Sequence, residues 1–194
     1  MRAILMAWAV SMALSLIGTP LLVKHFRGRG YGQSIREDGP QAHQEKKGTP
    51  TMGGIAIIGA AVAGYLVATL VLGPRYSAGG LLAMASFVGM GLVGFLDDSI
   101  KLRNKRNLGL TKTAKFGGQA VVTAFFAYFS TYVAQSATNL TFIGPLDLDL
   151  GAFFVVWAFF MLSGWSNAVN LTDGLDGLAA GSSAMVFGAY TFIA

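Results

Sequence analysis

The sequence predicts an all-α integral membrane protein, a polytopic bundle of helices. Hydrophobic residues make up 54% of the 194 residues and charged residues only 12%, a balance typical of membrane proteins. Long uncharged segments recur along the chain, each near the ~20 residues that a helix needs to cross a bilayer. Between them, the charged residues gather in a few short polar stretches. We therefore treat residues 1–194 as a single membrane domain.

Six uncharged segments are predicted to be membrane-spanning helices. The first follows a short basic N-terminus and resembles a signal peptide only superficially. Its apolar run is too long, and basic residues follow it where a cleavage site would lie. The six segments are residues 3–23, 53–72, 77–96, 116–133, 151–169 and 178–194.

Residues 135–150, between the fourth and fifth of these segments, are predicted to contain a short strand or β hairpin. Gly144 and Pro145 are turn residues. The run LDLDL that ends at Leu150 alternates apolar and acidic residues with the period of a strand.

The third segment contains GMGLVG at residues 89–94, a letter-for-letter match to the dinucleotide-binding fingerprint. That fingerprint requires a preceding strand, a following helix and an acid about 20 residues further on. Here the glycines lie inside an apolar helix, where small residues allow helices to approach closely. We interpret the run as a helix-packing surface.

The basic residues predict the topology. The stretches 24–51 and 97–115 each hold six of the 14 Lys and Arg residues. The positive-inside rule places both in the cytoplasm as loops and the N-terminus outside. Counting crossings places a third loop, residues 168–177, on the same side. The three polar stretches therefore share one membrane face, whereas a chance arrangement would scatter them.

The third loop carries polar residues three apart. If it is helical, Asn170, Asp173 and Asp176 share one face. If Gly174 and Gly177 end the helix, the carboxylates lie on a tight loop that a ligand can approach. Neighbouring carboxylates at a membrane edge require a cation or a hydrogen-bonding ligand. The alternative is that Asp173 or Thr172 is the N-cap of the next helix, with Asp176 near the positive end of that helix.

A second acidic pair, Asp97 and Asp98, follows the third segment. Neighbours on a helix diverge by about 100°, so the two cannot point the same way. Asp97 faces Lys101 at i+4, and Lys105 continues that face. One alternative is a solvated helix end with a weak salt bridge. However, the surrounding cations suit a polyphosphate or a lipid phosphate.

The first loop ends in KKGTPTMGG at residues 46–54. A lysine beside a Gly/Thr/Pro turn can hold a phosphate together with backbone N–H groups and a helix N-terminus. The alternative is a basic anchor at the membrane surface. His25 and His43 have no partners at metal-ligand spacing. The chain has no cysteine, which excludes a thiolate metal site and a cysteine nucleophile.

These motifs together resemble those of the phospho-N-acetylmuramoyl-pentapeptide-transferase family, a branch of the polyprenyl-phosphate N-acetylhexosamine-1-phosphate transferases. KxGTPTMGG from Lys46 and NAVNLTDGLDGL from Asn167 look like two signature motifs of that family. Asp97 and Asp98, followed by Lys101 and by NLGLT from residue 107, resemble the third. The resemblance runs from the first helix onward, and its motifs are long and specific.

The resemblance implies transfer of phospho-MurNAc-pentapeptide from UDP to undecaprenyl phosphate, with Mg²⁺, to give lipid I and UMP. This is the first membrane step of peptidoglycan synthesis. The implied partners are UDP-MurNAc-pentapeptide, undecaprenyl phosphate and the lipid bilayer, with no nucleic acid, and a homodimer is compatible with them. The implied location is the bacterial inner membrane, with the active site on the cytoplasmic face.

The resemblance also implies roles for residues. Asp97, Asp98 and Asp173 are expected to be catalytic and to hold the metal, and Asp98 is a candidate to take the proton from the lipid phosphate. A phosphate monoester is largely ionised at neutral pH, so a general base is not compelled. Breaking a pyrophosphate mainly requires positioning and charge neutralisation, and Mg²⁺ prefers carboxylate and phosphate oxygens. The residues expected to bind substrate are Lys46, Thr51, Lys101, Lys105, Lys115, Asn170 and Asp176.

The family's later aspartate and histidine-rich loop have no counterpart in this sequence. We therefore expect about six of roughly ten spans here, and no transfer by residues 1–194 alone. Two other functions are open. A related transferase would use UDP-N-acetylglucosamine, but GTPTMGG at residues 48–54 favours the muramoyl enzyme. A transporter would carry ionisable residues at mid-span, whereas these spans lack Asp, Glu, Lys and Arg.

Overall fold

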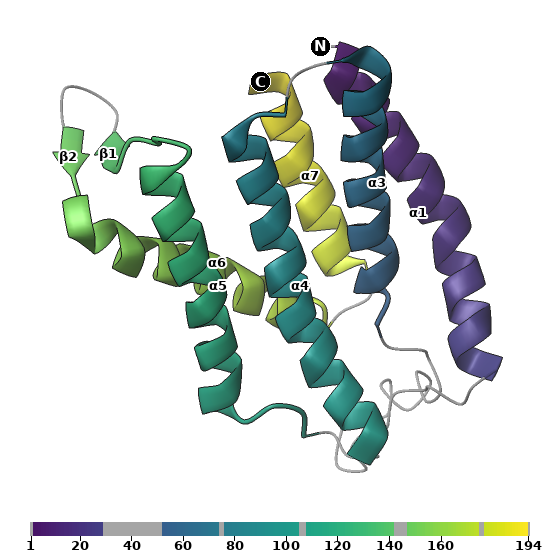
Figure 1. The fold of residues 1–194 in the computed structure, drawn as a ribbon. Helices are drawn as coiled ribbons and strands as arrows, with labels where there is room; N and C mark the ends of the chain where they lie inside the picture. Colours follow the sequence, from purple (N-terminus) through teal and green to yellow (C-terminus); the bar gives the residue numbers. More distant parts are fainter. Residues whose placement is uncertain are drawn as a thin grey trace.

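The computed structural model describes residues 2–28, 52–73, 76–104, 108–141, 147–174 and 177–193. It is a bundle of helices with one small sheet, which confirms the predicted all-α polytopic architecture (Figure 1). The strands are β1 (Asn139–Thr141) and β2 (Asp147–Asp149), and a short 3₁₀ turn, η1 (Gly151–Phe153), follows them. The helices are α1 (Arg2–Gly28), α3 (Gly54–Leu72), α4 (Ala78–Asn104), α5 (Lys112–Tyr132), α6 (Phe154–Thr172) and α7 (Leu178–Ile193).

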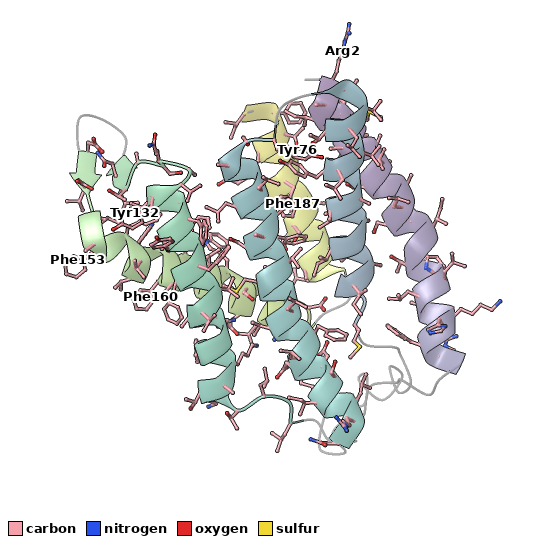
Figure 2. All side chains as sticks on the ribbon, in the orientation of Figure 1. Arg2, Tyr76, Tyr132, Phe153, Phe160 and Phe187 are labelled. Atoms are coloured by element: carbon pink, nitrogen blue, oxygen red, sulfur yellow. The ribbon has the colours of Figure 1, made fainter. Side chains whose placement is uncertain are left out.

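Four helical segments in the described part of the chain are long and apolar enough to cross a membrane: α1, α3, α4 and the stretch Gly151–Thr172. The other two predicted spans are also helices. Of these, α5 is more polar and α7 has only 16 residues. Large apolar side chains project outward, among them Phe153, Phe160 and Phe187 (Figure 2). Such a surface suits contact with lipid.

The ends of α4 and α5 differ from the predicted loop 97–115. Helix α4 continues to Asn104, and α5 begins at Lys112, so most of this stretch is helical. Lys101 and Arg103 lie in the last turn of α4, where cations complement the helix dipole. The Thr111 hydroxyl caps α5 by accepting a hydrogen bond from Ala114 N at 3.2 Å. Helix α1 continues to Gly28, and the remainder of the predicted loop 24–51 lies outside the described residues.

The break between α6 and α7 decides among the alternatives for the third loop. Helix α6 ends at Thr172, and Asp173 is its C-cap, with its N–H donating to Val169 O at 3.0 Å. Gly177 has a φ of 80° and precedes α7. The interpretation in which glycines end the helix is therefore correct, and a continuous helix is wrong. Asp173 caps the end of α6 and not the start of α7.

Glycines of α4 set the spacing to the neighbouring helices. A Cβ on Gly89 would lie 2.9 Å from the side chain of Val122 in α5. A Cβ on Gly91 would collide with the side chain of Ile58 in α3. Gly94 faces open space among the described residues. The helix-packing interpretation of residues 89–94 is thus confirmed at the first two glycines.

The predicted hairpin is present. Strands β1 and β2 pair antiparallel, with Leu140 opposite Leu148. Asn139 Nδ2 donates to Asp147 Oδ2 across the strands at 2.7 Å. The hairpin lies beyond the last turn of α5, at the end of that helix remote from Lys112 (Figure 1).

Candidate active site

A cavity of about 620 Å³ opens where several helices meet. Its walls come from the N-terminal part of α3, from α4, from the first half of α5 and from the last turns of α6. Much of the lining is apolar, including Ile55, Ile58 and Phe95. Its polar lining residues are Asp97, Asp98, Lys115, Gln119, Ser166 and Asn170.

The two carboxylates from α4 share one ammonium group. Lys101 Nζ lies 2.5 Å from Asp97 Oδ2 and 3.1 Å from Asp98 Oδ1. The expected i,i+4 pairing of Asp97 with Lys101 is therefore confirmed, and Asp98 joins it at i+3. One cation between two anions leaves this group of three side chains with one net negative charge.

The segment between α4 and α5 folds back onto Asp97. Leu110 N donates to Asp97 Oδ1 at 2.7 Å. Gly109 packs so closely that an added Cβ would collide with the Asp97 carboxylate and lie 2.7 Å from its backbone oxygen. Both oxygens of Asp97 are thus engaged by the protein. In contrast, Asp98 Oδ2 has no hydrogen bond or ion pair within the described ranges.

Helix α5 supplies a cation and an amide from one face. Lys115 and Gln119 are four residues apart, which places them together on a helix, and both line the cavity. Lys115 is half-buried, whereas Gln119 is only 1% exposed. Gln119 Oε1 accepts a hydrogen bond from Asn167 Nδ2 of α6 at 3.2 Å.

Four of the predicted site residues meet at this cavity: Asp97, Asp98, Lys115 and Asn170. Lys101 does not line it and is bound to the two carboxylates instead. The predicted residues that lie outside the described ranges are Lys46, Thr51, Lys105 and Asp176.

Asp173 was expected to hold metal and to act in catalysis. It is exposed at the end of α6 and is not among the lining residues of the cavity. Asn170, one turn earlier on α6, does line it. The polar end of α6 therefore reaches the cavity through the amide and not through this carboxylate.

Gln119 and Asn167 were not predicted from the sequence to be a functional pair. A helical-spacing signal was available, because Gln119 follows Lys115 by four residues and Asn167 precedes Asn170 by three. The hydrogen bond that joins them spans 48 positions in the sequence. Only the packing of α5 against α6 reveals it.

The cavity offers two carboxylates that could bind Mg²⁺, those of Asp97 and Asp98. The described ranges contain no group of three or more His, Asp or Glu side chains able to hold a metal. Mg²⁺ usually takes one or two protein carboxylates and completes its octahedron with water and substrate phosphates. Asp97 and Asp98 fit that pattern, and Asp98 Oδ2 has no competing protein donor in the part of the chain described here.

A family profile described as glycosyl transferase family 4 matches residues 80–194. This region includes every polar side chain that lines the cavity. The chain belongs to this family. A second profile, phospho-N-acetylmuramoyl-pentapeptide-transferase signature 1, matches residues 46–58. The signature segment reaches the cavity through Met52, Gly54, Ile55 and Ile58.

Curated relatives of the chain are named phospho-N-acetylmuramoyl-pentapeptide-transferase. The relative from Streptomyces griseus is 52% identical over the whole chain and 56% of its own length. That from Frankia casuarinae is 50% identical over the same shares. That from Streptomyces coelicolor is 52% identical over the whole chain and 57% of its own length. The resemblance inferred from the motifs is confirmed, and the chain spans just over half the length of these relatives.

Proposed function

We propose that the protein transfers phospho-MurNAc-pentapeptide from UDP-MurNAc-pentapeptide to undecaprenyl phosphate, forming lipid I and UMP. The observation that carries this proposal is the meeting of Asp97, Asp98, Lys115 and Asn170 at one cavity from three different helices. Relatives about half identical to the chain bear the name of this activity, which supports the choice of substrates.

The charges around the cavity suit phosphoryl transfer, which depends mostly on positioning and electrostatic stabilisation. Lys115 supplies a cation for a phosphate oxygen. Asp98, with one oxygen free of protein donors in the described ranges, is the better placed of the two acids to bind metal or accept a proton. Lys101 and Leu110 N hold Asp97 in place beside it. Mg²⁺ bound by this pair would neutralise charge on the substrate phosphates.

The apolar part of the cavity suits the lipid substrate. Ile55, Ile58 and Phe95 line the same space as the charged groups. An amphipathic substrate needs both environments, an apolar wall for its prenyl chain and cations for its phosphate. A soluble nucleotide sugar alone would not require the apolar wall.

The protein is a multi-pass membrane protein, and we further propose that it lies in the bacterial inner membrane with this cavity facing the cytoplasm. The positive-inside rule supports that orientation. Arg27, Lys101 and Arg103 lie at the last turns of α1 and α4, and Lys112 begins α5. These ends point to the same side of the bundle, and the N-terminus lies at the other side (Figure 1).

The test is an assay of a complete transferase that carries residues 1–194, purified in detergent. It receives undecaprenyl phosphate with either UDP-MurNAc-pentapeptide or UDP-N-acetylglucosamine. We expect lipid I from the first donor, loss of product on chelation and recovery with Mg²⁺. A product formed only from UDP-N-acetylglucosamine would support the related transferase instead.

A further inference from the structure

Gln119 is a neutral polar residue buried where α5 packs against α6. Its side chain is 1% exposed, and it lines the cavity. The Asn167 amide nitrogen donates to Gln119 Oε1 at 3.2 Å and to the backbone oxygen of Ser163 at 2.8 Å. Both N–H groups of Asn167 are therefore used, and one of them fixes Gln119 Oε1 as the acceptor.

This assignment leaves the Gln119 amide nitrogen with two hydrogens to donate. Within the described ranges, no hydrogen bond takes either of them. Gln119 Nε2 is not among the fully enclosed polar atoms without a partner in the described part of the chain, so it reaches the cavity, where a ligand that displaces water must offer it an acceptor. The remaining space beside Gln119 is the cavity itself, so the missing acceptor is expected there.

We propose that Gln119 binds substrate by donating its side-chain N–H to a phosphate oxygen, and that Asn167 positions it. This inference rests on the proposed function. The choice of a phosphate oxygen follows from the neighbouring groups. Lys115, one helical turn earlier, lines the same cavity, and an ammonium and an amide donor on one helix face together suit an oxyanion with several acceptor lone pairs.

The two substrates each carry phosphate, and the structure favours neither as the partner of Gln119. The shared chemistry is a phosphate oxygen acceptor. Separate Michaelis constants for the nucleotide sugar and for the lipid phosphate distinguish the sources. The constant that rises on removal of the amide donor identifies the substrate that Gln119 contacts.

The key variant is Gln119→Glu, which keeps an oxygen to accept from Asn167 but replaces the NH₂ donor with a second oxygen. The matched control is Thr123→Val on the same helix. Thr123 is also 1% exposed, and its hydroxyl donates to Gln119 backbone O at 2.8 Å. It does not line the cavity, and it lies one turn from Gln119, so a general disturbance of α5 would affect both variants.

In a complete transferase, we expect Gln119→Glu to raise KM for one substrate by about tenfold or more, as for loss of a hydrogen bond to a charged group. Thr123→Val should keep the parent values. Unchanged KM and kcat in Gln119→Glu would overturn the inference. So would equal losses of activity and of melting temperature in both variants, because they would show a structural role only.

If Gln119→Glu does not fold, a second measurement on the parent protein tests the inference. In the parent protein labelled with ¹⁵N-glutamine, the Gln119 side-chain amide signal should shift when UDP-MurNAc-pentapeptide or undecaprenyl phosphate is added. An unshifted signal with both substrates present would overturn the inference. Absence of lipid I synthesis by the parent protein would instead refute the proposed function.

Discussion

At the scale of single residues, the site depends on two carboxylates that share one ammonium group. Lys101 binds both Asp97 and Asp98, and Leu110 N occupies the remaining oxygen of Asp97. The two acids are therefore unequal. Asp97 is held by the protein, whereas Asp98 keeps an oxygen without a protein donor in the described ranges.

We predict that Asp98→Asn lowers kcat by about 100-fold or more, the scale on which a catalytic acid or base group contributes. The change removes the charge while it keeps the shape. Lipid I formation by the purified variant provides the measurement. Asp147→Asn, in the hairpin beyond the other end of α5, is the control and should keep normal turnover. Near-normal turnover of Asp98→Asn would remove Asp98 from the catalytic residues.

Gly109 gives a second test at this scale. Gly109→Ala would push a methyl group into Asp97, and Leu110 N would lose its hydrogen bond to the carboxylate. We expect turnover to fall by about tenfold, which corresponds to an increase of roughly 1.4 kcal/mol in the activation free energy. Leu108→Ala, at a side chain that is 78% exposed, is the matched control. Equal activity of the two variants would show that this contact does not position Asp97.

The sequence motifs predicted the acids, Lys115 and Asn170, because charged residues beside apolar spans stand out. They did not reveal Gln119, since one amide inside a helix carries no motif. Its importance depends on burial and on a partner in α6. Asp173 shows the converse. Its spacing from Asn170 suggested that the two share a helix face, but α6 ends at Thr172, between Asn170 and Asp173.

At the scale of helices and strands, glycine decides how closely the helices pack. Gly64 of α3 faces α1 so closely that an added Cβ would collide with the Ser11 hydroxyl and lie 2.6 Å from the backbone oxygen of Ala7. The backbone of α1 cannot move aside to make room for a methyl group, whereas the end of a flexible side chain can. The crossing of α1 and α3 therefore depends on the absence of a side chain at residue 64.

We predict that Gly64→Ala destabilises the protein by about 1 to 3 kcal/mol through overpacking. Thermal unfolding in detergent measures the effect. Gly59→Ala on the same helix is the control, because Gly59 has open space around its Cα among the described residues. A melting temperature for Gly64→Ala equal to that of Gly59→Ala would mean that α1 and α3 do not pack as described.

The hairpin has a pH-dependent contact. The pKa of Asp149 is lowered, mainly because the Thr138 hydroxyl donates to its carboxylate at 2.6 Å, and also because Gly151 N donates at 2.9 Å. These bonds stabilise the hairpin above the ordinary carboxyl pKa, and that stabilisation is lost as pH falls through the folded value. Thr138→Val should raise the pKa of Asp149, measured by NMR titration, and an unchanged pKa would contradict this assignment.

Helix boundaries were the least predictable feature at this scale. The composition of residues 97–115 suggested a loop because cations cluster there, but α4 and α5 extend into it. Charged residues are compatible with a helix that continues beyond the apolar span, where i,i+3 and i,i+4 ion pairs support it. The hairpin and the break at Gly177 were easier to predict, because turn residues and a glycine that can adopt a positive φ act on the local backbone.

At the scale of the whole molecule, the polar ends of separate helices meet. The positive-inside rule and the count of crossings together predicted that the second and third loops share one membrane face, and the structure brings their residues to one cavity. Composition also predicted the membrane class, since four segments of the described chain have the length and apolar character of spans. The side of the membrane on which the cavity opens is a proposal that requires a direct test.

Accessibility of Ser166, which lines the cavity from α6, provides that test. Residues 1–194 contain no cysteine, so Ser166→Cys introduces the first thiol into this part of the protein. Any cysteine elsewhere in the complete transferase is first replaced by serine. In vesicles containing the complete transferase, we expect a membrane-impermeant maleimide to label it only from the cytoplasmic side. UDP-MurNAc-pentapeptide at roughly ten times its dissociation constant should slow labelling by about tenfold, while Asn104→Cys at the end of α4 stays unprotected. Labelling of Ser166→Cys from outside, or labelling that the nucleotide sugar does not slow, would contradict a cytoplasmic substrate site in this cavity.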